Sequence, residues 1–433
     1  MDAPVVRIAL VGAGNVGSAL VALLRDQSRV EMLVDAAGAR LELVAIAVRD
    51  AHRTRPGVPG DITTDDALAM VSRNDVDVVV EVAGGVHEAR TIVEAAIGAG
   101  KSVVTANKAL MAECGTELVQ RARQAGVDLF YEGAVAGGIP ILRALRTSLA
   151  GERIIRVMGI VNGTTNFILS KMTSEGIDYS TALAEAQLLG FAEADPRADV
   201  EGFDAAAKVS ILSSLAFGTP LSGQSIFREG ITGVSADDVA YAGQHGYVIK
   251  LLGIAERVGE LGISRRVHPA MVPVEHPLAS VNGAFNAVFV EGAVSGPLMW
   301  LGQGAGGEPT AAAVLGDVVA AARNVVTSRC DAPLSVDPTL GEFPLGELQS
   351  IFYLAVDVLD RPGVLAAVAS VFGEHSVSIK KMEQSGVGDE ARLTFLTHMA
   401  FEADIAATLE DLSQLDVVDK VGSCIRIVGE TES

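Results

Sequence analysis

The stretch V-V-R-I-A-L-V-G-A-G-N-V-G, from Val5 to Gly17, decides the fold of the first part of this chain. An apolar run typical of a buried strand leads into a Gly-x-Gly-x-x-Gly turn, and a helical leucine pattern follows at residues 20–24. In this arrangement Gly12 permits a tight turn, Gly14 lets a pyrophosphate approach closely, and Gly17 lets helix and strand pack together. The N-terminus of the helix then offers backbone N–H groups to the phosphates. We therefore expect a dinucleotide site at Gly12, Ala13, Gly14, Asn15, Val16 and Gly17.

Further apolar runs alternate with helical patterns after this turn, at residues 41–48, 76–82, 102–105 and 127–131. The alternation predicts an α/β fold with a doubly wound parallel sheet, a Rossmann domain at residues 1–135. The second run ends at Arg49 and Asp50. An acidic residue there would bind the ribose hydroxyls of NAD, whereas Arg49 would bind the 2′-phosphate of NADP. The arginine favours NADP, with NAD as the alternative.

Three segments farther along carry charged and polar residues at fixed spacing. They read T-A-N-K (residues 105–108), N-G-T-T-N-F-I-L (162–169) and G-F-A-E-A-D-P-R-A-D-V-E-G-F-D-A-A-A-K (190–208). In the last segment Lys208 lies one helical turn after Asp204, on the face that Ile211 and Leu215 continue. One interpretation is an ordinary ion pair on a helix surface, worth a few tenths of a kcal/mol. The apolar face and the acid-rich loop favour a partly desolvated functional site.

Composition excludes several partner classes. The formal charge of −21 argues against nucleic acid and anionic membranes as partners. Residues 1–10 lack a signal-peptide pattern, and no apolar run approaches the roughly 18–20 residues that span a bilayer. The three cysteines are far apart and lack metal-site spacing. We expect a cytoplasmic protein without a nucleic-acid or membrane partner.

Together these segments resemble the homoserine dehydrogenase family, and four further stretches extend the resemblance over roughly residues 5 to 330. They read E-G-A-V-A-G-G-I-P-I (132–141), H-P-A-M-V-P (268–273), V-N-G-A-F-N-A-V (281–288) and G-Q-G-A-G-G-E-P-T-A (302–311). The resemblance implies NAD(P)-dependent reduction of L-aspartate 4-semialdehyde to L-homoserine, on the route to threonine, methionine and isoleucine. It also implies a central α/β domain for substrate binding and dimerisation at residues 136–304, and a helix at about residues 305–330 that returns to the first domain.

The resemblance assigns roles residue by residue. Lys208 becomes the proton donor or acceptor and Asp204 its partner. The substrate would contact Glu193, Asp199, Asp204, Lys108 and Thr164. Lys108 would also lie near the nicotinamide, and Gly306 would contact the cofactor through its backbone. A monovalent cation, with sodium favoured, would be held by Glu132 and the carbonyls of Val135, Gly137 and Ile139.

The reduction of an aldehyde needs these residue types independently of the resemblance. Hydride addition to an aldehyde leaves an alkoxide, which needs a proton and nearby positive charge, and a lysine held by a carboxylate supplies both. Carboxylates suit the ammonium group of an amino-acid substrate. Two structural alternatives remain open: Lys108 as a polar residue that ends a strand, and residues 132–141 as a glycine-rich bend without an ion.

The C-terminal part has its own pattern. Residues 333–348 are rich in proline and glycine and are predicted to be a linker. Residues 349–433 show a β-α-β-β-α-β order, which is the ferredoxin-like plan. The D-R-P-G-V-L stretch at residues 360–365 resembles the ACT domain, which implies binding of a small amino acid at the loop before the first helix, often across a dimer. Feedback inhibition by threonine is the implied role, a purely structural dimerisation module is the alternative, and a homodimer or homotetramer is expected.

Other functions need other residues. A 2-hydroxy-acid dehydrogenase with an ACT domain would use a histidine, and the candidates are His87, His245, His268 and His276. An aldehyde dehydrogenase would need a nucleophilic cysteine, but Cys114 lies in a predicted helix. A non-enzymatic amino-acid sensor would have lost residues between Glu193 and Lys208, and no loss is visible.

Overall fold

The computed structural model describes residues 3–221, 226–260, 262–331, 339–387 and 390–429. The chain forms two compact units. Unit 1 comprises Met1–Val157, Ala207–Ile226 and Asn286–Leu340, and unit 2 comprises Met158–Ala206, Phe227–Phe285 and Gly341–Ser433. Strand β7 (Ile154–Ile160) and helix α10 (Phe203–Phe217) each begin in one unit and end in the other.

Unit 1 contains a six-stranded parallel sheet in the order β3-β2-β1-β4-β5-β6. Its strands are β1 (Val5–Val11), β2 (Arg40–Ala47), β3 (Thr63–Thr64), β4 (Val78–Glu81), β5 (Ser102–Thr105) and β6 (Leu129–Phe130). The order reverses between β1 and β4, and a ligand crevice forms at the carboxyl ends of strands at such a point. The predicted doubly wound Rossmann sheet is therefore confirmed.

Helices connect and cover these strands. They are α1 (Asn15–Arg25), α2 (Val30–Ala37), α3 (Ala67–Val71), α4 (His87–Gly98) and α5 (Lys108–Ala125), with short 3-10 turns η1 (Gln27–Arg29) and η2 (Gly60–Ile62). The apolar strands are buried on both faces because helices pack on both sides, as parallel sheets require. Ile8, Leu10 and Val80 form the centre of this core.

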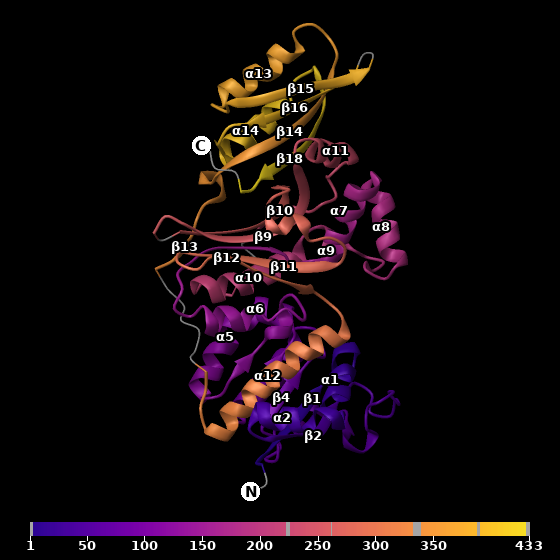
Figure 1. The fold of residues 1–433 in the computed structure, drawn as a ribbon, viewed down its shortest axis with the longest axis vertical. Helices are drawn as coiled ribbons and strands as arrows, with labels where there is room; N and C mark the ends of the chain where they lie inside the picture. The colour runs from indigo at the N-terminus through magenta and orange to yellow at the C-terminus, as the bar shows by residue number, and fades with distance from the viewer. Residues whose placement is uncertain (1–2, 222–225, 261, 332–338, 388–389, 430–433) are drawn as a thin grey trace. The chain divides into compact units, whose positions relative to one another are not determined.

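Helix α12 (Gly307–Thr327) comes late in the sequence but belongs to the core of unit 1. Figure 1 shows it in orange beside the indigo α1, α2 and β1. Val314 and Val318 on α12 pack in the same core as Ile8 and Leu10. By length and composition alone α12 could cross a membrane, but a buried core helix passes the same test. The buried face of α12 is that of a core helix.

The rest of unit 1 supports the crevice. It includes η3 (Glu132–Ala134), α6 (Ile141–Arg143), the single π-helical turn η4 (Ala144–Ser148), β11 (Phe285–Gly292) and β12 (Gly296–Gln303). β11 and β12 form a hairpin whose turn is held by Glu152, which accepts hydrogen bonds from the Val294 and Ser295 amides. Along β12 exposed and half-buried side chains alternate, and the exposed ones include Met299 and Leu301.

Unit 2 begins with helices and a long hairpin. Its first elements are α7 (Gly163–Glu175), α8 (Tyr179–Leu188), α9 (Arg197–Val200), β8 (Phe227–Arg228), α11 (Ala236–Gln244), β9 (Tyr247–Val258), β10 (Gly262–Pro273) and η5 (Pro277–Ser280). β9 and β10 pair antiparallel over their whole length. Most of their side chains are buried, which fits the long apolar runs of their sequence.

The C-terminal module, drawn in orange to yellow in Figure 1, has the predicted β-α-β-β-α-β order. Its elements are β14 (Gln349–Leu359), α13 (Val364–Glu374), β15 (Ile379–Val387), β16 (Glu390–Thr397), β17 (Ala400–Phe401), α14 (Glu402–Leu412) and β18 (Val418–Ile427). The sheet order is β18-β14-β16-β15. Phe352, Phe372 and Phe395 fill the core under the two helices. The ferredoxin-like prediction is confirmed.

The C-terminal sheet does not end at β18. β18 pairs parallel with β10, Ala270 opposite Arg426 and Met271 opposite Ile427. The C-terminal module therefore shares a sheet with the β9–β10 hairpin. Part of the predicted linker, residues 333–338, lies outside the described residues, and the rest contains β13 (Gly341–Glu342) and η6 (Leu345–Glu347).

Candidate active site

The glycine turn after β1 has the geometry of a phosphate-binding loop. Gly12 has φ +98°, and a Cβ there would lie 2.7 Å from the backbone of Ala83. A Cβ on Gly17 would lie 2.1 Å from the Gly12 carbonyl oxygen, whereas a Cβ on Gly14 would meet nothing within 4 Å. Gly14 is the N-cap of α1 and provides no side-chain cap, so the first N–H groups of the helix are available to an anion. A side chain would therefore clash at Gly12 and Gly17, whereas Gly14 lies at the open start of α1.

A cavity of about 570 Å³ extends from this turn to the end of β2. Arg49, Arg53 and Arg55 all line it. Asp50 is used within its own loop, because its carboxylate accepts hydrogen bonds from the amides of His52 (3.0 Å) and Arg53 (3.2 Å). The end of the cavity beside β2 is therefore basic.

A second cavity of about 540 Å³ in unit 1 brings together residues predicted for the cofactor, the substrate and catalysis. Asn15 and Val16 of the glycine turn line it, together with Lys108, Lys208 and Gly306. Lys108 is the exposed first residue of α5, whereas Lys208 on α10 is only 8% exposed. Two lysines and two loops predicted to bind the dinucleotide thus line one cavity.

Two polar residues that the sequence reasoning missed support this cavity. Glu81, the buried last residue of β4, accepts hydrogen bonds from the Thr105 hydroxyl (2.6 Å) and the amide of Ala83 (2.9 Å). Asn107 caps α5 and donates to the carbonyl of Gly85 (2.6 Å). A lone acid at the end of an apolar strand and an asparagine before a helix were the available signals.

Unit 2 contains the carboxylates that the sequence predicts to bind substrate. Asn162 is the N-cap of α7, and its Oδ1 accepts a hydrogen bond from the Thr165 amide (2.9 Å). Its Nδ2 donates to Oδ1 of Asp199 (2.7 Å) and to Oδ2 of Asp204 (2.9 Å). One buried amide therefore holds two predicted substrate ligands together. The sequence reasoning did not single out Asn162, although Asn-Gly before a helical pattern is an N-cap signal.

The other two predicted substrate residues lie near the acid-rich loop. The Thr164 hydroxyl donates to the Phe191 carbonyl (2.7 Å), and the Phe167 and Phe191 rings pack 4.8 Å apart. Glu193 is exposed, and its backbone carbonyl accepts a hydrogen bond from Gln187 (3.1 Å). Thr164 thus anchors the loop that carries Glu193.

Helix α10 carries Asp204 in its first turn and Lys208 one turn later. Asp204 is 6% exposed, and neighbours such as Val209 and Ile211 are fully buried. The interpretation as an ordinary surface ion pair is therefore wrong for these residues. Burial of a charged pair is costly without partners, and such pairs mark functional sites more often than solvated pairs do.

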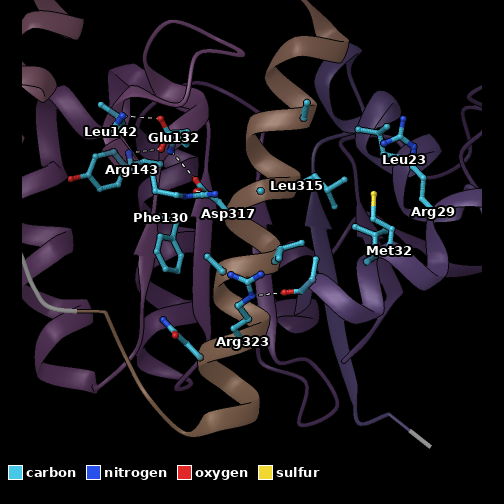
Figure 2. Close-up of a pocket in the computed structure, with 18 of the residues that line it drawn as sticks. Leu23, Arg29, Met32, Phe130, Glu132, Leu142, Arg143, Leu315, Asp317 and Arg323 are labelled. Carbon is cyan, nitrogen blue, oxygen red and sulfur yellow. Dashed lines mark hydrogen bonds and ion pairs between the residues drawn. The ribbon is translucent and has the colours of Figure 1, made fainter. Parts of the chain in front are cut away.

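Glu132 occupies a buried network with α12. Figure 2 shows its carboxylate facing the start of α6, where it accepts hydrogen bonds from the amides of Leu142 (2.8 Å) and Arg143 (2.7 Å). The Glu132 amide donates to Asp317 of α12 (2.8 Å), and Asp317 also pairs with Arg143 (2.6 Å). Burial, with the nearby charge of Asp317, raises the pKa of Glu132 to about 7.

The residues after Glu132 form an unusual bend. Ala136 and Gly137 both have positive φ, +55° and +54°. A non-glycine residue in this region is strained and is retained where the surroundings demand it. The Ile139 carbonyl already accepts a hydrogen bond from Ile141 (2.8 Å). Among the predicted cation ligands, both Glu132 carboxylate oxygens and the Ile139 carbonyl thus already accept hydrogen bonds from backbone amides. Among the described residues there is no cluster of three or more metal-binding side chains.

A Rossmann sheet, a glycine turn and two lysines in one cavity define a dinucleotide-dependent oxidoreductase, here with an ACT module. Family models match in the same order: the NAD-binding domain of homoserine dehydrogenase at residues 12–132, homoserine dehydrogenase at 140–319 and the ACT domain at 352–417. The homoserine dehydrogenase of Mycobacterium tuberculosis is 50% identical over 99% of both chains. The chain belongs to the homoserine dehydrogenase family.

Solved structures agree with this assignment. A homoserine dehydrogenase from Thiobacillus denitrificans superposes with a TM-score of 0.92 at 40% identity, covering 98% of each chain. A hyperthermophilic archaeal homoserine dehydrogenase in complex with NADPH gives a TM-score of 0.63 at 28% identity, over 76% of this chain and 99% of that one. The 2-hydroxy-acid dehydrogenase, the cysteine-dependent aldehyde dehydrogenase and the non-enzymatic sensor are therefore excluded as interpretations.

Proposed function

We propose that this enzyme catalyses the reversible, NADPH-dependent reduction of L-aspartate 4-semialdehyde to L-homoserine, in the biosynthesis of threonine, methionine and isoleucine. Membership of the family supports the reaction. The observation that carries the assignment of residues is the cavity in unit 1 lined by Lys108, Lys208, Gly306 and the glycine turn. Reduced nicotinamide supplies the hydride there.

Lys208 is the residue that gives the alkoxide its proton in this proposal. Its burial favours it over the exposed Lys108, because a charge acts more strongly at short range when water is excluded. Lys108 adds positive charge to the same cavity, where it would contact substrate and nicotinamide. Asp204, one turn earlier on α10, orients Lys208.

The acidic residues of unit 2 bind the substrate's ammonium and hydroxyl end. Asp199 and Asp204 are held as a pair by Asn162, which presents two carboxylates at fixed positions. Glu193 completes the set from the exposed loop, and Thr164 positions that loop. The carboxylates give the ammonium charge-assisted hydrogen bonds.

NADP is the proposed cofactor, with NAD as the weaker alternative. Three arginines line the cavity at the end of β2, whereas the Asp50 carboxylate is engaged by its own loop. Guanidinium groups suit a 2′-phosphate, and an engaged carboxylate is less available to the ribose hydroxyls. The complex of the archaeal relative with NADPH is consistent with this preference.

A sodium ion is proposed at Glu132, Val135, Gly137 and Ile139. The support is the buried carboxylate and the strained bend at Ala136, which would turn carbonyl oxygens toward one point. An ion there would fix the loop that lines the cavity with Lys108 and Gly306 through Ala136 and Gly137.

The quaternary and regulatory proposals rest on the C-terminal module and on β12. We propose feedback inhibition by threonine through the ACT domain, in a cytoplasmic homodimer or homotetramer. Exposed Met299 and Leu301 on strand β12 offer an apolar edge for a second copy. The proposed boundaries are a dinucleotide domain at residues 1–135 joined by α12, a substrate domain at 136–304, a linker at 333–348 and the ACT domain at 349–433.

The test is oxidation of NADPH and NADH with L-aspartate 4-semialdehyde in buffers containing sodium or potassium, for wild type and for Lys208→Ala. We expect turnover with a preference for NADPH. Lys208→Ala should lower kcat by about 100-fold or more, the usual contribution of a general acid, while NADPH still binds. Lys171→Ala is the matched control, because Lys171 pairs with Glu175 and Glu185 on the surface of α7. Unchanged turnover in Lys208→Ala would remove that residue from the mechanism.

A further inference from the structure

The cavity in unit 1 that Lys108 and Lys208 line has no acidic side chain among its described lining residues. Its walls include residues 82, 84 and 85 after β4 and residues 106–109 after β5. In the proposed reaction the loss of a hydride turns the neutral ring of reduced nicotinamide into a cation in this cavity. Positive charge that develops beside lysines is stabilised by a fixed negative charge nearby.

Glu81 is a buried carboxylate directly behind these walls. It is the last residue of β4 and is 0% exposed. Its Oε1 accepts hydrogen bonds from the amides of Ala83 (2.9 Å) and Gly84 (3.1 Å), and its Oε2 accepts one from the Thr105 hydroxyl (2.6 Å). No cationic side chain of the described residues pairs with it. A buried, unpaired charge is costly and is screened little by solvent, so its field acts on the adjacent cavity.

Hydrogen bonds connect the Glu81 carboxylate to both loops of the cavity wall. The Thr105 hydroxyl that donates to Glu81 also accepts a hydrogen bond from the Asn107 amide (3.0 Å). Asn107 Nδ2 donates to the Gly85 carbonyl (2.6 Å), which closes the connection between the two loops. The carboxylate is therefore fixed relative to the cavity, and a charge held in this way needs no rearrangement when the reaction occurs.

Other carboxylates near this cavity in the sequence are used elsewhere or are exposed. Glu132 precedes the lining residues 133 and 134, but its carboxylate faces the start of α6 and accepts two amide hydrogen bonds there (Figure 2). Glu308 follows the lining residue 307 and is exposed, so solvent screens its charge. Asp204 accepts a hydrogen bond from Asn162 and orients Lys208 in the proposed function. Glu81 is therefore the carboxylate best placed to act on the ring.

We propose that Glu81 is a positioning residue whose charge favours the oxidised, positively charged nicotinamide over the reduced, neutral one in this cavity. The inference rests on the proposed function, because it needs the nicotinamide ring beside Lys108 and Lys208. Glu81 does not line the cavity, so it acts across the two loops that it holds rather than by contact. The same charge favours hydride transfer to the semialdehyde, because positive charge grows on the ring in the transition state.

The test is the binding of NADP+ and NADPH to the full-length enzyme, measured by isothermal titration calorimetry. Glu81→Gln keeps the length of the side chain and an oxygen that can accept from the Ala83 and Gly84 amides, but it removes the charge. We expect the ratio of the two dissociation constants, Kd for NADP+ over Kd for NADPH, to rise more than about threefold. A purely structural role of Glu81 would raise both constants together and leave the ratio unchanged.

Two variants control for charge and for burial. Glu81→Asp keeps the charge, so its ratio should stay within about threefold of wild type even if both constants rise. Asp128→Asn is the matched control and should have the wild-type ratio. Asp128 is a buried carboxylate at the amino end of β6, where it accepts hydrogen bonds from the Asn324 side chain (2.9 Å) and the Asp331 amide (2.8 Å). If Glu81→Gln does not fold, the double variant Glu81→Met, Thr105→Val removes the same charge together with its hydroxyl partner, and the ratio is measured in the same way.

The outcomes separate this inference from the proposed function. A ratio in Glu81→Gln within about threefold of wild type would overturn the inference, and so would an equal rise in Asp128→Asn. If wild type binds both nucleotides but does not reduce L-aspartate 4-semialdehyde, the proposed reaction is wrong, while the ratio still decides the role of Glu81. If wild type binds neither NADP+ nor NADPH, the ratio is measured with NAD+ and NADH. Absence of binding by both pairs overturns the inference and the proposed cofactor site together.

Discussion

Replacing Asn162 with aspartate tests the role of the carboxylates of Asp199 and Asp204 with almost no change in shape. The amide Nδ2 that now donates to Asp199 and Asp204 would become a third carboxylate oxygen, 2.7 and 2.9 Å from theirs. Aspartate is as good an N-cap as asparagine, so α7 should still start at Gly163. The change is therefore confined to the hydrogen bonds and charge at the paired carboxylates.

The expected loss in kcat/KM follows from these two hydrogen bonds of Asn162. A hydrogen bond to a charged acceptor contributes about 1.5–3 kcal/mol, and two are lost. Two like charges about 4 Å apart repel by about 4 kcal/mol at an effective dielectric constant of 20, although protonation and small movements relieve part of this. A net loss of about 3 kcal/mol in transition-state binding corresponds to roughly 150-fold in kcat/KM.

The assay is steady-state reduction of L-aspartate 4-semialdehyde at saturating NADPH, with the KM for NADPH measured separately. We expect kcat/KM for the semialdehyde to fall by about 100-fold and the KM for NADPH to stay within threefold, because the glycine turn is in unit 1. Asn162→Ser keeps a capping oxygen and adds no charge, so its loss should be smaller. Asp178→Ala, which removes the N-cap of α8, is the control for a helix-cap effect alone. A variant Asn162→Asp with kcat/KM within threefold of wild type would show that the paired carboxylates do not bind the substrate.

Three further predictions concern the cofactor and the fold. Arg49→Ala should lower kcat/KM for NADPH by about 10- to 100-fold, because it removes one charge-assisted contact to the 2′-phosphate, and kcat/KM for NADH should change little. Equal losses for both cofactors would contradict a role of Arg49 in binding the 2′-phosphate. Gly17→Ala should lower the melting temperature, because its Cβ would lie 2.1 Å from the Gly12 oxygen. Gly14→Ala should melt like wild type but bind NADPH weakly. Equal melting temperatures for the two variants would refute the assignment of Gly17 to packing and Gly14 to phosphate binding. Burial lowers the pKa of Lys250 to about 8, so the unfolded chain binds more protons between pH 8 and about 10.4, and stability should rise with pH across that window. In Lys250→Met, the rise in the free energy of unfolding with pH, measured by urea unfolding, should be smaller by about 3 kcal/mol. Parallel pH profiles of this free energy for the two proteins would rule the effect out.

The parts of the fold predicted best are those encoded locally. The glycine turn could be assigned because the left-handed φ at Gly12 and the close backbone contact at Gly17 each exclude a side chain, whereas the space at Gly14 is open. Strand ends were less predictable. Strand β18 begins at Val418, because pairing with β14 extends it through a stretch without alternation.

The sequence predicts candidate site residues only where their spacing along one element is visible. Lys208 and Asp204 share a helix, so their spacing was visible in the sequence. Asn162 is 42 residues from Asp204, so its role arises from a tertiary contact that no local pattern encodes. Helix α10 is not the helix with one apolar face that the sequence predicts. It is buried on most sides, and Asp204 and Lys208 lie among buried apolar residues.

The parallel pairing of β10 with β18 has a consequence for shortened forms of the enzyme. A chain cut before residue 349 would lose β14 and β18 and leave β10 with a free edge carrying Met271 and Val272, now fully buried. An unpaired apolar edge is a template for intermolecular strand addition. Removing the ACT module should therefore give a protein that self-associates, rather than a deregulated soluble enzyme. Charged residues introduced along the β10 edge should prevent this association.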